Sequence, residues 1–191
     1  MLLVLLVALS SAAADSWYDR GSQIFTISAG PSVPLTYTTA GGTSVGPGNG
    51  NTNFSLGGIG SIAYQIYVNP WRSFGAELGY QFNLANDGDV FTSVPILARM
   101  SMNAFQTSHF EIPVSLGFGA NYIAYNGYSK LTIGTTVEVE GRWFFMDNWG
   151  IGLKTGISLI PEFYSGLSAM GESKNALLTQ IPVMLTITYR S

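Results

Sequence analysis

Seven charged residues spaced along the chain are the strongest candidates for chemistry in this sequence. Glu138, Glu140 and Arg142 follow one another at every second position, and residues two apart lie on one face of a β-strand. Opposite charges that face each other across a sheet stabilise it, whereas an uncompensated charge in a closed interior is costly. We therefore predict a cluster of mutually neutralising charges that fills the lumen of a barrel, consisting of Glu77, Arg99, Glu111, Glu138, Glu140, Arg142 and Lys154.

Catalytic chemistry has little support. The single histidine, His109, has no recognisable nucleophile and acid arranged around it. The glycine pairs Gly58/Gly60 and Gly117/Gly119 lie inside predicted strands with no helix after them, so they are not phosphate-binding loops. The absence of cysteine excludes disulfides and thiolate metal sites. We expect a protein that is not an enzyme and that needs neither cofactor nor metal.

The elements that must position the charges are β-strands. From Phe74 to Leu84, every even position is apolar and every odd position is Gly or polar, which is the pattern of a strand with one apolar face. A tilted strand crosses a bilayer in roughly 9 to 11 residues, and the predicted segments are about that long or longer. They are 22–37, 53–69, 73–85, 91–102, 109–124, 131–146, 149–160 and 176–189.

The position of the charges decides which face meets water. All seven fall on the polar face of their strands, and the apolar faces carry none, so we expect the apolar faces to meet hydrocarbon. A soluble, secreted ligand-binding barrel is the alternative, but it would place its charges outward. The prediction is therefore an all-β fold: an eight-stranded, antiparallel, up-and-down transmembrane β-barrel with meander topology. In the expected register Glu77 lies directly opposite Arg99, and Glu140 directly opposite Lys154.

The connections alternate in length, as in outer-membrane barrels. Long stretches at 38–52 and 161–175 and turns at 86–90 and 125–130 would lie outside, and those at 70–72, 103–108 and 147–148 would lie in the periplasm. Aromatic residues at strand ends suggest interfacial girdles. The periplasmic girdle would contain Trp71, Phe74, Phe110, Trp143, Phe145, Trp149 and Tyr189, and the outer one Tyr37, Phe54, Tyr80, Phe82, Phe91, Tyr122 and Tyr128.

The N-terminal sequence has the features of an export signal. Leu2 to Ala14 is an uncharged run that is apolar except for Ser10 and Ser11. It is too short to span a bilayer as a helix, and it ends in three alanines. We expect cleavage after Ala14, leaving 15–191 as a single barrel domain.

The overall composition also fits a membrane protein. Charged residues make up only 10% of the chain, which would leave a water-facing surface poorly soluble. The net charge of −3 without a basic cluster argues against a nucleic-acid partner.

The pattern as a whole resembles the small eight-stranded bacterial outer-membrane barrels typified by OmpW, OmpX and the OmpA transmembrane domain. The closing segment Ile181–Tyr189 carries the resemblance most clearly, although Arg190 and Ser191 follow the aromatic residue on which such proteins usually end. The resemblance implies an integral protein of the outer membrane that contacts its lipid and is inserted by the barrel-assembly machinery. Both termini would then be periplasmic.

Three functions fit this interpretation. The first is an OmpW- or OmpX-like barrel that presents surface loops to a host partner or passes a small hydrophobic molecule. The second is a purely structural or adhesin-type barrel with a plugged lumen, and the third is an outer-membrane lipid-modifying enzyme.

Passage of a small hydrophobic molecule would need an entrance in the barrel. The outer half of the lumen would form an uncharged cup above the paired charges, lined by Gly79, Gln81, Asn83, Ser93, Gly119, Asn121, Thr132, Gly134, Ser158 and Gln180. Pro95 and Pro182, each of which removes a ladder hydrogen bond, mark a candidate lateral gap in the wall.

Overall fold

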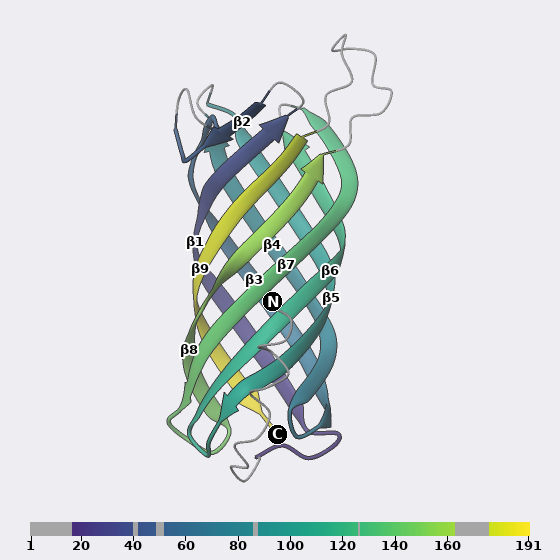
Figure 1. The fold of residues 1–191 in the computed structure, drawn as a ribbon, viewed down its shortest axis with the longest axis vertical. Coiled ribbons are helices and arrows are strands. Elements are labelled where there is room, and N and C mark those ends of the chain that lie inside the picture. Colours follow the sequence, from purple (N-terminus) through teal and green to yellow (C-terminus); the bar gives the residue numbers. More distant parts are fainter. Residues whose placement is uncertain (1–16, 40–41, 49–51, 86–87, 126, 163–175) are drawn as a thin grey trace.

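The chain forms one antiparallel sheet that closes into a barrel (Figure 1). The computed structural model describes residues 17–39, 42–48, 52–85, 88–125, 127–162 and 176–191. The strands are β1 (Gln23–Thr39), β2 (Gly42–Val45), β3 (Phe54–Asn69), β4 (Arg72–Ala85), β5 (Val90–Gln106), β6 (Phe110–Tyr125), β7 (Tyr128–Phe144), β8 (Trp149–Glu162) and β9 (Ala176–Arg190). The eight long strands pair in chain order, and β1 also pairs with β9, which closes the ring. This confirms the predicted eight-stranded meander barrel.

The two ends of the barrel differ. At one end, here called the terminal end, β1 begins, β9 ends and the hairpin turns are short (Figure 1). At the other, the loop end, the short strand β2 pairs with the last residues of β1, from Thr36 to Thr39. This strand was not expected, because the sequence suggested only a loop over 38–52. The described part of the chain contains no helix able to cross a membrane.

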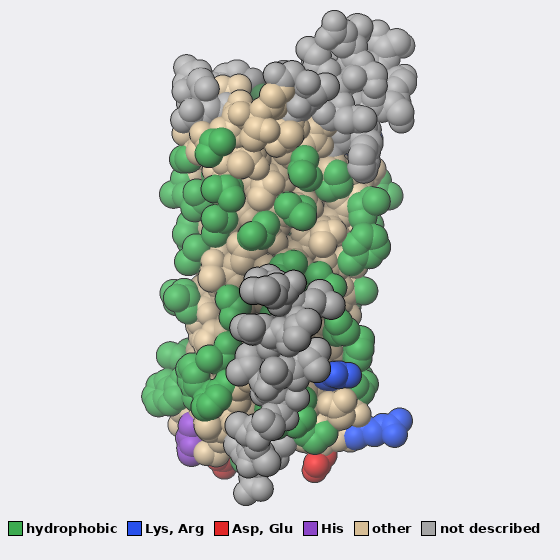
Figure 2. All heavy atoms as spheres, in the orientation of Figure 1, with side chains coloured by type: hydrophobic (Ala, Val, Ile, Leu, Met, Phe, Trp, Pro, Cys, Tyr) green, Lys and Arg blue, Asp and Glu red, His purple; other side chains and the backbone are tan. Residues whose placement is uncertain are grey.

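Side chains alternate across the wall as the two-residue period requires. The outward positions of the described strands are dominated by Ile, Leu, Val and aromatic residues, whereas the inward positions carry Ser, Thr, Gln, Asn and the charged residues. In Figure 2 apolar side chains are spread over most of the visible wall, and charged side chains appear only near the terminal end. The barrel is therefore apolar outside, and its lumen is mainly polar with apolar clusters toward the two ends.

The register of the β4–β5 hairpin differs from the predicted one. Leu84 pairs with Val90, which places Glu77 opposite Leu97 and Arg99 opposite Gly75, so the prediction that Glu77 directly faces Arg99 was wrong. A shift by two residues keeps every side chain on the same face, and the apolar pattern alone cannot detect it. The predicted pairing of Glu140 with Lys154 is confirmed.

Candidate functional site

The lumen contains two layers of buried ion pairs. In the first, Arg99 Nη1 donates to a carboxylate oxygen of Glu77 and, at 2.6 Å, to Glu138 Oε2. Lys154 Nζ lies 3.1 Å from Glu77 Oε1 and 3.5 Å from Glu138 Oε2. Each carboxylate therefore faces both cations, and the four residues come from β4, β5, β7 and β8. Their side chains are almost fully buried.

The second layer lies closer to the terminal end and is built around Arg142. Its guanidinium donates from Nε and Nη2 to the two oxygens of Glu140, at 3.0 and 2.8 Å, and from Nη1 to Glu111 Oε1 at 2.5 Å. The Thr186 hydroxyl adds a bond of 2.6 Å to Glu140 Oε1. Such bidentate, charge-assisted contacts fix geometry strongly. The structure thus places all seven predicted lumen charges inside the barrel and joins them into two layers.

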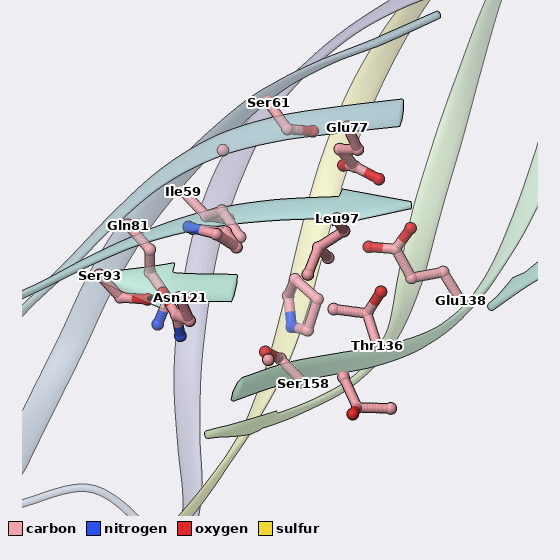
Figure 3. Close-up of a pocket in the computed structure, with 15 residues that line it drawn as sticks. Ile59, Ser61, Glu77, Gln81, Ser93, Leu97, Asn121, Thr136, Glu138 and Ser158 are labelled. Atoms are coloured by element: carbon pink, nitrogen blue, oxygen red, sulfur yellow. Dashed lines mark hydrogen bonds between the residues drawn. The ribbon is translucent and has the colours of Figure 1, made fainter. Parts of the chain in front are cut away.

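A small cavity, lined by both polar and apolar side chains, separates the ion pairs from the loop end (Figure 3). Glu77 and Glu138 lie on one side of it, and Gln81, Ser93 and Asn121 lie on the opposite side. The space open to the centre of a water molecule is about 20 Å³, which suits roughly one water. The uncharged side chains around it bond to one another: Ser93 donates to Asn121 Oδ1 at 2.8 Å and Gln81 to Asn83 Oδ1 at 3.1 Å. The polar side chains of this layer therefore hold one another in place around a cavity of about one water's volume.

An apolar layer closes the lumen at the loop end. It consists of Phe54, Ala85, Phe91, Ile123, Ile160 and Leu178, with Tyr37 and Tyr125 packed against it, and is called the apolar cap below. The Phe54 and Phe91 rings lie 5.4 Å apart, and their residues are 7% and 1% exposed. Both were predicted to belong to the outer lipid-facing girdle, which was wrong. The expected open cup was wrong for the same reason, because its polar residues lie beneath this cap.

Strand parity explains the cap. Phe91 shares the odd parity of Arg99 in β5, so it points inward, as alternation requires. Phe54 turns inward because the β3–β4 register shifts between Phe54 and Gly57, and a bulge of this kind reverses the faces of the residues beyond it. Other predicted girdle residues, including Tyr80, Phe82 and Tyr122, are exposed on the outer wall.

The terminal end is closed by residues that the sequence did not single out. The Tyr18 ring stacks on Tyr67 at 3.7 Å with an interplanar angle of 8°, and the Tyr18 hydroxyl donates to Glu111 Oε1 at 3.1 Å. Burial, and secondarily the Glu111 carboxylate, raises the pKa of Tyr18 above its usual range. Arg190 is also buried here. Arg190 has the same even parity as Thr186 and Thr188 in β9, so strand alternation could have predicted that it points into the lumen. Tyr18 precedes β1 and belongs to no periodic segment, so the sequence gives no sign of its burial.

Both predicted gap prolines border the central cavity. The β4–β5 pairing is interrupted between Leu78↔Ile96 and Gln81↔Ser93, the stretch that contains Pro95. The β8–β9 pairing is interrupted between Thr155↔Val183 and Ser158↔Gln180, beside Pro182. These interruptions fit the loss of an N–H donor at proline.

His109 lies in the turn between β5 and β6 at the terminal end and is exposed. Its Nδ1 is 2.8 Å from the Ser108 hydroxyl, a contact that the sequence alone did not reveal. The two residues are adjacent in the chain and stand in solvent rather than in a cleft. Among the described residues, no group of three or more His, Cys, Asp or Glu side chains is arranged to hold a metal ion.

Two solved outer-membrane barrels are similar to this fold. Neisserial surface protein A superposes with a TM-score of 0.56 at 12% identity, covering 86% of this chain and 96% of its own. The outer membrane protein OprG from Pseudomonas aeruginosa superposes with a TM-score of 0.52 at 10% identity, covering 93% and 99%. No curated protein matches the sequence.

A protein-family model matches residues 9–190. At the identities found, the two solved structures establish the fold alone, whereas the family model covers nearly the whole chain. The protein therefore belongs to that family, which is uncharacterised, and has the fold of the small eight-stranded outer-membrane β-barrels.

Proposed function

We propose that this protein is a non-conducting barrel of the bacterial outer membrane that presents its outer loops at the cell surface. The observation that carries the proposal is the closed lumen. A molecule entering from the loop end would meet the apolar cap, then a polar layer with space for roughly one water, then two layers of ion pairs. Interiors of eight-stranded barrels are just wide enough for side chains to fill.

The orientation proposed here puts the terminal end in the periplasm. The short turns at this end, such as that between Asn69 and Arg72, and the longer connections at the loop end support it. Residues 38–52 and 161–175 would then face outward, where a host surface partner is the expected contact; 40–41, 49–51 and 163–175 fall outside the described residues. Outer-membrane lipid would surround the wall, and the barrel-assembly machinery would insert it.

The absence of catalysis is part of the proposal. Ser108 and His109 are exposed neighbours in one turn, whereas a Ser–His catalytic pair needs a third group to orient the histidine and a site for the substrate. Every lumen carboxylate is engaged by a cation. Substituting His109 with Ala should leave folding and any surface binding unchanged, and loss of a lipid-modifying activity in that variant would favour an enzyme.

A second candidate function is lateral passage of a small hydrophobic molecule into the membrane. It is favoured by the interrupted pairing beside Pro95 and Pro182, which border the same cavity. The apolar cap would admit such a molecule more readily than an ion. Replacing both prolines with Val would restore N–H donors in the wall, and uptake of a small hydrophobic solute into reconstituted vesicles should fall if the lateral route exists.

The two candidates are separated by solute class. In vesicles that contain the barrel, a small neutral sugar should not enter if the lumen is closed. Entry of the sugar would contradict the non-conducting barrel. Entry of a hydrophobic solute alone, reduced by the double change P95V/P182V, would favour the lateral route, and entry of neither would leave the outer loops as the functional part.

A further inference from the structure

The segment from Trp17 to Ser22 enters the terminal end of the barrel without belonging to its wall. β1 begins only at Gln23, and the barrel closes through the β1–β9 pairing, which runs from Ile24↔Arg190 onward. Two backbone bonds of 2.8 Å tie the segment to β3, from Gly21 N to Tyr67 O and from Tyr67 N to Ser22 O. Gly21 adopts a φ of 97°, which favours glycine, and this residue turns the chain back toward the lumen.

Tyr18 is the part of this segment that fills the lumen. It is 1% exposed, although it stands in an irregular segment at the end of the barrel. Its ring covers Tyr67, and its hydroxyl reaches Glu111 in the second ion-pair layer. Tyr67 in turn accepts a hydrogen bond of 3.1 Å from Asn103 Nδ2. The Tyr18 side chain therefore separates the lumen charges from solvent at the terminal end.

Arg190 holds the segment in place from the last strand. Its guanidinium carbon lies 4.2 Å from the ring centroid of Trp17 and 3.6 Å from that of Phe144, which are cation–π distances. It also donates to the carbonyl oxygens of Asp147 at 2.7 Å and Ser108 at 3.0 Å. One side chain near the end of β9 thus contacts the N-terminal segment and two terminal-end turns.

We propose that residues 17–22 are a removable plug, separate from the wall, and that its withdrawal opens the terminal end of the lumen down to the Glu111–Arg142 pair. Withdrawal would break the two backbone bonds to Tyr67, the Tyr18–Tyr67 ring stack, the Tyr18–Glu111 hydroxyl bond and the contacts of Trp17 and Tyr18 with Arg190. It would leave the pairings between the barrel strands intact. The apolar cap would remain, because its residues belong to the strands at the loop end. The open state would be a polar vestibule with a closed floor. This inference goes beyond the proposed function, because it concerns how the terminal end of the lumen is closed.

The absence of cysteine in the chain allows a direct accessibility test. Asn103 is buried in the lumen at the level of Glu111, directly beneath the Tyr18–Tyr67 stack, where its Nδ2 donates to the Tyr67 hydroxyl oxygen at 3.1 Å. In the Asn103→Cys protein, folded in detergent, a bulky membrane-impermeant thiol reagent should react slowly. Adding Tyr18→Ala should raise the labelling rate about tenfold or more, because local opening then no longer limits access.

Two matched variants control this test. Trp149→Ala removes an exposed aromatic residue at the same rim and should leave the labelling rate of the introduced thiol unchanged. Trp17→Ala removes one of the aromatic rings that contact Arg190 but no buried contact in the lumen. This variant should therefore fold normally and give a labelling rate between those of the parent and Tyr18→Ala. Heat-modifiable migration on a gel would verify folding of each variant. If neither Trp17→Ala nor Tyr18→Ala changes the rate, the segment is not a plug.

The outcome is independent of the proposed function. Tyr18→Ala should raise labelling while the protein still conducts no ions, because the apolar cap remains. Conductance by the parent protein would contradict the closed lumen and leave the plug standing. Equal labelling rates with no conductance would contradict the plug and leave the non-conducting barrel standing.

Discussion

Lys154 on β8 places its ammonium 3.1 Å from the Glu77 carboxylate on β4, on the opposite wall of the barrel. Three long strands separate β4 from β8 in either direction around the ring. The contact therefore crosses the whole lumen, and with Arg99 and Glu138 it ties four strands together. A lumen spanned in this way is a packed core.

Breaking the ion-pair layer should cost more than deleting a matched pair. Arg99→Leu leaves Glu77 and Glu138 with Lys154 as their one close cation, and we expect a loss of about 3 to 5 kcal/mol in the free energy of unfolding. The double change E77L/R99L leaves Glu138 beside Lys154 as a balanced pair and should lose less. Urea unfolding in detergent or lipid measures both, and equal losses would mean that Glu77 and Arg99 do not act as a pair.

The apolar cap should contribute to stability as a buried core does. Phe91→Ala removes a ring that is 1% exposed and should cost about 3 to 5 kcal/mol in the free energy of unfolding. Phe82→Ala, on the lipid-facing side of the wall, is the matched control and should cost less. A larger loss for the control, measured by the same urea titration, would place Phe91 outside the packed lumen.

Tyr18 should make the free energy of unfolding decrease at alkaline pH. Burial, followed by the Glu111 carboxylate, raises the pKa of Tyr18 in the folded protein, whereas the unfolded chain ionises near the ordinary value of about 10. The stability contributed by the neutral phenol is therefore complete below pH 10 and is lost as the pH rises beyond it. The stability of the parent relative to Tyr18→Phe should fall above pH 10. If the free energy of unfolding changed with pH in the same way for both proteins up to pH 12, the pKa of Tyr18 would not be raised by folding.

The proposed orientation can be tested at Gly48, in the connection after β2 at the loop end. An epitope tag inserted there should be recognised by antibody on intact cells, because both the first and the last strand would start or end in the periplasm. A tag that becomes visible only after the outer membrane is permeabilised would reverse the topology.

The sequence was sufficient for the fold, because strict two-residue alternation determines which face of each strand is apolar. It placed Glu111 and Lys154 in the lumen for the same reason. It could not distinguish registers that differ by two residues, so Glu77 was paired with the wrong partner position. Nor could it show that Phe54 turns inward at a bulge, or that Tyr18, which lies outside any periodic segment, returns to fill the barrel end.

Ion conductance of the purified protein in a planar lipid bilayer would show whether the lumen is closed. We expect no discrete current steps from the parent protein or from Tyr18→Ala, because the apolar cap and the ion-pair layers remain in both. Stable, stepwise openings from the parent protein under the same conditions would contradict a closed lumen.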